Sequence, residues 1–447
     1  DWAPYLYHTT DYGRKWKRLA GPNKVTGFCL SVVQDPELPN LLFLGTDQGL
    51  YYSLDYGDSW THWPGVEDGK TGGLPCMPVQ DMKIHPRDAD LVLGTFGRAI
   101  WILDNIRPLR ELARNPALLD KPFALFAPQP AILASWRSYE GPRFSADAFY
   151  AGANKSTQAQ VPVWVKPAPP KKEPGKKEAA ESDDTRTESA AGRGRRGGRG
   201  GNKEKATVFV LDAQGDTLRR WKAELDSCFS TISWGLDTRG VQYPSNREPN
   251  RDQLEPGGGP RVLPGRYKMV VSYKEYQDSV LVDVIDDPRL QLSVADREKN
   301  AAAIRLFHQL VERSGKAYDR LKNAEKTIAL VESQLIHVPD SVKKEVLKLG
   351  EALRDSIEAM KNEFFAQKEG KGIQRNPNTL NNYLRQAINY IDNSPAEPNG
   401  AAQIAMRQAE SEVDRVLARI DRFFAQDWAP YREKAERIQY SLFKDDE

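Results

Sequence analysis

The feature that most constrains this sequence is an internal repeat in its first hundred residues. Residues 32–60 and 79–104 share one frame: a strand, a proline turn, an apolar strand ending in Gly-Thr, a glycine-containing turn and an aromatic-rich strand. An aspartate recurs in this frame as Asp11, Asp55 and Asp104, at intervals of 44 and 49 residues. A period in the forties with several short strands per unit predicts four-stranded β-propeller blades.

Two of the repeats carry the same turn sequence. Residues 53–60 (SLDYGDSW) fit the pattern Ser-x-Asp-x-Gly-x-Ser/Thr-Trp, and residues 9–16 (TTDYGRKW) follow it loosely, with Lys15 in the Ser/Thr position. In such a turn the carboxylate accepts backbone N–H groups, glycine supplies a positive φ and the tryptophan packs between sheets. We therefore expect a structural rather than a catalytic role for Thr9, Asp11, Gly13, Trp16, Ser53, Asp55, Gly57, Ser59, Trp60 and Asp104, the last being all that survives of the motif in its copy.

These repeats resemble the Asp-box (BNR-repeat) propellers of sialidase-type and sortilin-like proteins. The chain as a whole resembles large bacterial sortilin-like or glycosyl-hydrolase-like proteins. The residues that carry this resemblance are 45–60, 93–105, 208–221, 233–237 and 263–271. It implies an Asp-box propeller, a linker, an immunoglobulin-like domain and a terminal helical region. It also implies a propeller that binds peptides or glycans, in a periplasmic, outer-membrane-associated or secreted protein.

The expected fold is multidomain, with all-β propeller blades followed by a β-sandwich and an all-α bundle. Residues 1–107 would form the C-terminal blades: two blades and the outer strands of a third. Residues 108–150 would form a connector, 151–288 an immunoglobulin-like sandwich and 289–447 an antiparallel helical bundle. The low-complexity stretch 167–205 contains nothing that can bury a core, so it is interpreted as a disordered insertion in the sandwich.

The helical prediction rests on a change of period after residue 292. Ser293 and Asp296 form a capping-box start, and apolar residues then recur at helical spacing through four segments. We expect the bundle to fold around Phe307, Leu321, Leu353, Ile357, Leu417 and Ile420.

Composition excludes several classes of function. Lys+Arg (64) and Asp+Glu (62) nearly cancel, which argues against a chain-wide nucleic-acid partner. The sequence holds no apolar run of the roughly 20 residues that a membrane helix needs. Cys29, Cys76 and Cys228 are scattered without metal-ligand spacing, and the five histidines show none either. We therefore expect no cofactor, metal, nucleic-acid partner or membrane span.

The ligand face follows from blade geometry. The turn between the second and third strands lies opposite the Asp-box turn, so Asp47, Gln48, Phe96 and Arg98 are ligand-face candidates. A solvated turn is the alternative. Sialidase chemistry, as the resemblance implies it, needs a Tyr/Glu pair, an acidic Asp and three arginines from several blades, which this arc cannot assemble.

We therefore favour a cell-envelope or secreted scaffold that binds a peptide or glycan, and we assign no catalytic residue. One alternative is an exo-acting glycoside hydrolase with its catalytic residues in further N-terminal blades. Another is an oligomeric platform assembled through the bundle. The N-terminal blades, from the same precursor or from a separate chain, are the expected protein partner, because an open arc leaves sheet faces in water.

Overall fold

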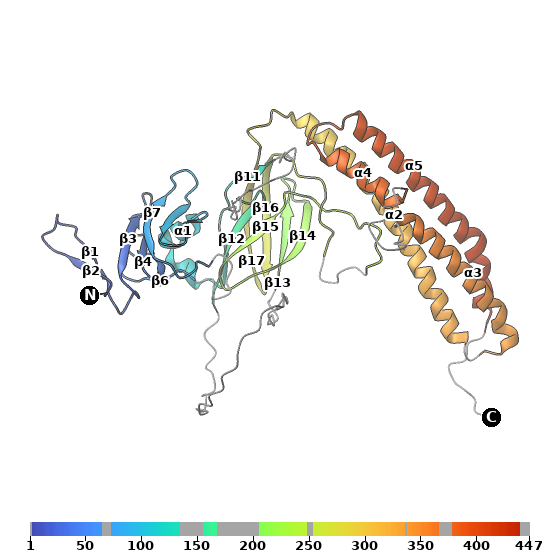
Figure 1. Cartoon of the computed structure of the whole chain (residues 1–447), viewed down its shortest axis with the longest axis horizontal. Coiled ribbons are helices and arrows are strands. Elements are labelled where there is room, and N and C mark those ends of the chain that lie inside the picture. Colours follow the sequence, from blue (N-terminus) through green and yellow to red (C-terminus); the bar gives the residue numbers. More distant parts are fainter. Residues whose placement is uncertain are drawn as a thin grey trace, which may run out of the picture.

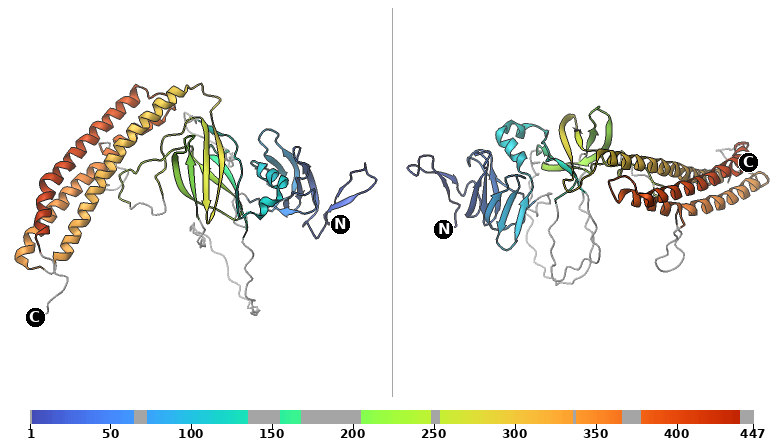
Figure 2. Two further views of the ribbon diagram at one scale, coloured as in Figure 1. Left: turned by 180° about the vertical axis from the view of Figure 1, so that it is seen from behind. Right: turned by 90° about the horizontal axis from the view of Figure 1, so that it is seen from above.

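The computed structural model describes residues 2–64, 73–134, 155–167, 205–247, 254–335, 338–365 and 378–438. Small antiparallel sheets, a domain of two packed sheets and a helical domain follow one another along the chain, with the termini at opposite ends (Figure 1). The views from behind and from above show the same succession (Figure 2). The fold is therefore a multidomain mixture of antiparallel sheets and helices. The expected disordered insertion 167–205 lies, apart from its ends, outside the described residues.

The first hundred residues form three antiparallel sheets with strands in chain order, which we call sheets I, II and III. Sheet I holds β1 (Leu6–His8) and β2 (Lys17–Ala20). Sheet II holds β3 (Cys29–Gln34), β4 (Leu42–Thr46), β5 (Gly49–Ser53) and β6 (Thr61–His62). Sheet III holds β7 (Val79–Ile84), β8 (Leu91–Thr95) and β9 (Ile100–Leu103).

Sheet II is packed on both faces because successive side chains of a strand point to opposite sides. Leu44 of β4 packs with Ala20 of sheet I, whereas its neighbour Phe43 packs with Leu93 of sheet III. The apolar run at 41–44, which lacks polar alternation, is explained by this burial on both faces.

The Gly-Thr of the repeat marks a close approach between sheets. A Cβ atom at Gly45 would lie 2.5 Å from the Val79 carbonyl oxygen of β7 and 2.5 Å from Ser31 Oγ. Only glycine fits there without a shift of the backbone. The equivalent Gly94 of sheet III has more room, since its nearest neighbour would be the Asp81 carbonyl oxygen at 3.6 Å, within its own sheet.

Helix α1 (Arg107–Arg114) follows sheet III and is held against sheet II by a buried charge. The Arg110 guanidinium, which is 3% exposed, contacts Asp35 Oδ2 at 2.9 Å and Glu37 Oε1 at 2.6 Å. The Asn40 side chain donates to the Ala113 carbonyl oxygen at 2.9 Å. A short 3₁₀ helix, η2 (Pro116–Asp120), comes next.

The two-sheet domain packs a three-stranded sheet against a five-stranded one. The first has the order β10 (Phe123–Leu125), β12 (Ala159–Val165), β15 (Cys228–Trp234). The second has the order β11 (Ala131–Leu133), β17 (Tyr276–Asp286), β16 (Gly265–Tyr273), β13 (Lys205–Leu211), β14 (Thr217–Glu224). Val163, Trp234, Val208 and Met269 belong to their shared core. Strands β10 and β11 lie in the stretch that the sequence assigned to a connector.

The helical domain contains α2 (Val294–Gln334), α3 (Asp340–Phe364), α4 (Leu380–Asp392), α5 (Gly400–Phe423), a π-helical turn η4 (Phe424–Trp428) and α6 (Ala429–Glu436). The Ser293 hydroxyl accepts a hydrogen bond from the Asp296 amide at 3.0 Å, as the capping box predicts. Five of the six expected core residues are buried, and Leu417 is partly buried against the same core.

Residues 241–247, which we call the strap, cross from the two-sheet domain onto α2. The backbone of the strap approaches α2 closely at Gly315, where an added Cβ atom would lie 2.8 Å from the Gln242 carbonyl oxygen. Lys322 Nζ donates to the Ser245 carbonyl oxygen at 3.1 Å, and the Tyr318 hydroxyl donates to the Asn246 side chain. The strap therefore fastens the helical domain to the β domain along one side of α2.

Candidate functional site

The Asp55 turn is held by its own side chains. Asp55 Oδ1 accepts from the Ser59 amide at 2.8 Å and Oδ2 from the Ser59 hydroxyl at 2.6 Å, while Ser53 Oγ accepts from the Gly57 amide at 2.8 Å. Burial alone would raise the pKa of the Asp55 carboxyl, but these bonds outweigh it and lower the pKa. Both Tyr56 (φ 58°) and Gly57 (φ 84°) are left-handed, whereas the pattern accounts only for the glycine.

The Asp11 turn repeats this arrangement. Asp11 Oδ1 accepts from the Lys15 amide at 2.8 Å, so a lysine at this position preserves the backbone contact. The two tryptophans differ in their partners. Trp60 Nε1 donates to the Leu19 carbonyl oxygen of sheet I at 3.1 Å, whereas Trp16, 61% exposed, donates to Gly13 in its own turn.

Asp104 lies at a different position from Asp55, contrary to the alignment of the repeats. Leu42 pairs with Ser53 in sheet II, and the matching Leu91 pairs with Leu103 in sheet III. The position of Asp55 is therefore taken by Asn105. The cause is one extra residue in the second hairpin, since ten residues separate the paired Leu42 and Ser53 whereas eleven separate the paired Leu91 and Leu103. Burial raises the pKa of the Asp104 carboxyl, which lies 3.8 Å from Lys155 Nζ.

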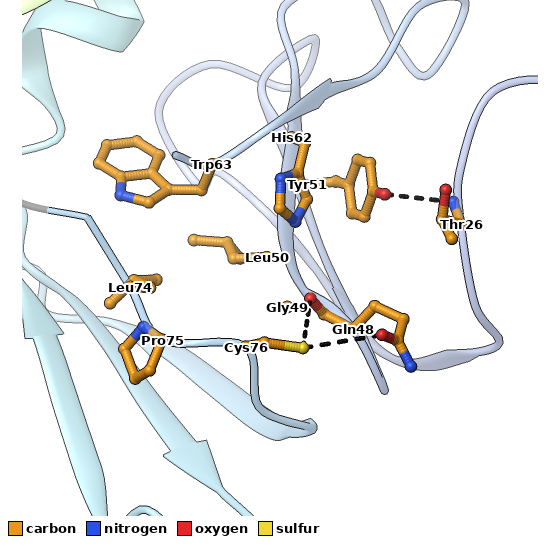
Figure 3. A pocket seen from close by; sticks show the side chains of 10 residues that line it. All are labelled: Thr26, Gln48, Gly49, Leu50, Tyr51, His62, Trp63, Leu74, Pro75 and Cys76. Atoms are coloured by element: carbon orange, nitrogen blue, oxygen red, sulfur yellow. Dashed lines mark hydrogen bonds between the residues drawn. The ribbon is translucent and has the colours of Figure 1, made fainter. Parts of the chain in front are cut away.

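A pocket of about 470 Å³ opens at the other end of β5 (Figure 3). Strand β5 begins at the pocket with Gly49 and ends at Ser53 in the Asp55 turn, so the two features lie at opposite ends of one strand. Four chain segments line the pocket: Thr26 in the loop before β3, residues 48–51, residues 62–63 and residues 74–76. Its lining includes Gln48, Leu50, Tyr51, His62, Leu74 and Cys76.

Three of the polar side chains at the pocket, those of Gln48, Tyr51 and Cys76, already have partners. Gln48 Nε2 donates to Asp47 Oδ2 at 2.8 Å, and the Cys76 thiol contacts Gln48 Oε1 at 3.6 Å (Figure 3). The Tyr51 hydroxyl accepts from the Thr26 amide at 3.1 Å. Asp47 Oδ1 accepts from the Phe28 amide at 2.8 Å. The Asp47 side chain thus secures the turn, and it is not among the residues that line the pocket.

The structure places the four ligand-face candidates at one edge of sheets II and III. The segment after Cys76 joins their turns, because the Phe96 amide donates to the Pro78 carbonyl oxygen at 3.0 Å. Phe96 is 72% exposed and Arg98 is also exposed; of the four candidates, only Gln48 lines the pocket. His62, Leu74 and Cys76 were not predicted as site residues, since His62 ends the short strand β6 and the other two lie in the connection to the next repeat, where the sequence carries no motif.

The lining decides what chemistry the pocket can perform. Among the described residues, no aspartate or glutamate lines the pocket, whereas a typical glycoside hydrolase uses a pair of carboxylates. The described part of the chain contains no group of three or more metal-ligating side chains. Within the same residues, no helix is both long and apolar enough to cross a membrane.

Comparison with known proteins adds no relative. No model of a known protein family matches the chain. A search of curated protein sequences also finds no match.

Proposed function

We propose that the chain is part of a non-catalytic binding scaffold, in which sheets I–III form an arc of an Asp-box β-propeller. The repeated turns at Asp11 and Asp55 and the stacking of the three sheets support this. The two-sheet domain would be immunoglobulin-like, and with the helical domain it would position the arc relative to other molecules. A bacterial cell-envelope or secreted location is part of the proposal and rests on the sequence resemblance alone.

The observation that carries the proposal is the pocket beside Gln48. It is concave, it lies at the strand ends opposite the Asp55 turn, and its volume is in the range of small-ligand sites. Its described lining residues include hydrophobic and aromatic side chains and no carboxylate, which favours binding over hydrolysis. The ligand would be a peptide or a glycan that also contacts the exposed Phe96 and Arg98.

The test is to probe peptide and glycan arrays with the whole chain and to measure the affinity of each ligand selected. We expect Gln48→Ala combined with Phe96→Ala to weaken binding at least tenfold. The control is Arg87→Ala, an exposed change in the turn at the opposite end of β7. Equal binding by all three proteins would overturn the proposal, as would turnover of a glycoside.

The proposed protein partner is a further sheet of the same repeat on each side of the arc. Ile100 and Ile102 of sheet III occupy the positions that Leu50 and Tyr52 occupy in sheet II, as the strand pairings show. Leu50 and Tyr52 pack toward sheet III. The isoleucines are instead 69% and 56% exposed. Gly45 of sheet II must be glycine because β7 of the next sheet lies against it. The equivalent Gly94 of sheet III has no such neighbour among the described residues.

The same reasoning applies to sheet I. Tyr7 corresponds to Tyr51, which packs toward the preceding sheet, but Tyr7 is exposed, as is Trp16. Exposed apolar sheet faces promote association between chains. Sedimentation analysis should therefore show less self-association after Ile100→Lys and Ile102→Lys together than after the control Leu281→Lys, an exposed strand residue of β17. An equal effect of both changes would count against a missing sheet.

A further inference from the structure

We propose that the pocket beside Gln48 receives one large uncharged side chain, aromatic or aliphatic, of a protein or peptide. The inference rests on the proposed binding function and specifies its ligand: the partner is a polypeptide and not a sugar. It follows from the shape and chemistry of the lining, from the hydrogen bonds already present there, and from the lack of a lysine, arginine, aspartate or glutamate among the described lining residues.

The floor of the pocket is apolar and closely packed. Leu50 and Leu74 are 1% and 5% exposed, and Pro75 is buried beside them. The Tyr51 ring is fixed between two contacts: its hydroxyl accepts from the Thr26 amide, and the His62 ring lies 4.7 Å from it, centroid to centroid. A side chain entering the pocket would exchange water for hydrocarbon and ring faces, and that transfer is favourable in proportion to the apolar area buried.

The polar groups argue against a sugar. A sugar ring has several hydroxyl groups, and each must find a new partner when it leaves water. Here the Gln48 carboxamide is bonded to Asp47 and approached by the Cys76 thiol, and the Tyr51 oxygen already accepts a backbone proton. A sugar would have to satisfy its hydroxyls mainly with the Tyr51 O–H proton, the His62 ring and the Thr26 hydroxyl, whereas an apolar side chain requires no polar partner.

The volume of the pocket and the charge of its lining limit which side chains it can receive. A volume of about 470 Å³ is enough for a single large side chain with part of its backbone. Among the described residues, no lysine, arginine, aspartate or glutamate lines the pocket. A charged side chain would therefore lose its hydration without gaining an ion pair from these lining residues. The best match is an uncharged residue such as tryptophan, phenylalanine or leucine.

Cys76 gives a direct readout, because its exposed thiol stands at the pocket while Cys29 and Cys228 are only partly exposed elsewhere. The experiment measures iodoacetamide alkylation of each thiol in the whole chain by mass spectrometry. The probes are N-acetyltryptophanamide, N-acetylleucinamide, N-acetylglycinamide and methyl β-glucoside. We expect saturating N-acetyltryptophanamide to slow Cys76 alkylation at least threefold, N-acetylleucinamide to act in the same direction, and the glycine and sugar probes to have no effect.

A second measurement uses ligand-observed NMR. Cys76→Phe would fill the mouth of the pocket and should abolish N-acetyltryptophanamide binding, whereas Arg87→Ala should retain it. Protection by the glucoside equal to that by the tryptophan derivative would overturn the inference while leaving a glycan-binding scaffold standing. No protection by any probe, together with unchanged binding by Cys76→Phe, would also refute it. The array test with Gln48 and Phe96 variants would then decide the proposed function separately.

Discussion

The strap makes Gly315 the residue whose replacement tests the domain junction most directly. In an exposed helix interior, glycine to alanine stabilises a protein by roughly 1 kcal/mol, because alanine is the better helix former. At Gly315 the new Cβ would lie 2.8 Å from the Gln242 carbonyl oxygen, closer than carbon and oxygen can approach. The obstacle is backbone, so either the strap or the helix must move.

The expected size of the effect follows from two opposing contributions. Overpacking at a tight contact costs typically about 1–3 kcal/mol. After the gain in helix propensity, Gly315→Ala should lower the free energy of unfolding of the helical domain by up to about 2 kcal/mol. Gly350 of α3 is the matched control, since its new Cβ would meet only side chains, the nearest being Ile328 Cγ2 at 3.3 Å. Gly350→Ala should be neutral or stabilising by up to roughly 1 kcal/mol.

The assay combines urea unfolding, followed by circular dichroism at 222 nm, with amide hydrogen exchange of residues 241–247. Gly315→Ala should speed exchange in the strap, and Gly350→Ala should leave it unchanged. If both variants gain stability equally and the strap exchanges at the same rate in each, the strap does not pack on α2 as described. The reasoning would then be wrong at its first step.

Three further changes test other parts of the molecule. Asp55→Ala should cost roughly 1–3 kcal/mol by leaving turn amides unpaired, whereas Asp104→Ala should be nearly neutral in the same thermal melts. Because the pKa of Asp55 is lowered on folding, its contribution should be present above about pH 4 and lost as acid titration passes the folded pKa. Arg110→Ala should cost about 3–5 kcal/mol in urea unfolding, since Asp35 would stay buried without its cation. Burial, with Glu325 and Asp319 nearby, raises the pKa of Tyr318 to about 12, so its stabilising contribution should decline between about pH 10 and 12, and Tyr318→Phe should remove that decline.

Local patterns predicted the elements that depend on local chemistry. The Asp55 turn was predictable because its contacts join residues within eight positions of one another. The start of α2 at Ser293 was predictable for the same reason. The expected core residues of the helices, such as Phe307 and Ile420, are buried because helical spacing alone puts them on one stripe.

Features that depend on distant residues were missed. Aligning the repeats matches their first and last residues. It does not show that the hairpin at Phe96 contains one extra residue. That residue moves Asp104 out of the position that Asp55 occupies. The pocket unites Gln48 with Cys76, which comes from a connection without periodicity. The strap could not be predicted from the sequence either. A glycine inside a helix only indicates a locally destabilising residue, and its contact with Gln242 depends on how the two domains are arranged.

The strap also makes α2 a lever. A helix of 41 residues is about 62 Å long at 1.5 Å per residue, and among the described residues its contacts with the β domain and the strap run from Arg297, which pairs with Asp286, to Lys322. A rotation of one degree at one end of such a rod displaces the other end by roughly 1 Å. Any partner that holds the far end of the helical domain would therefore exert torque on the β domain through the strap and the Arg297–Asp286 ion pair. Small shifts of the strap would in turn become large displacements at the far end of α2.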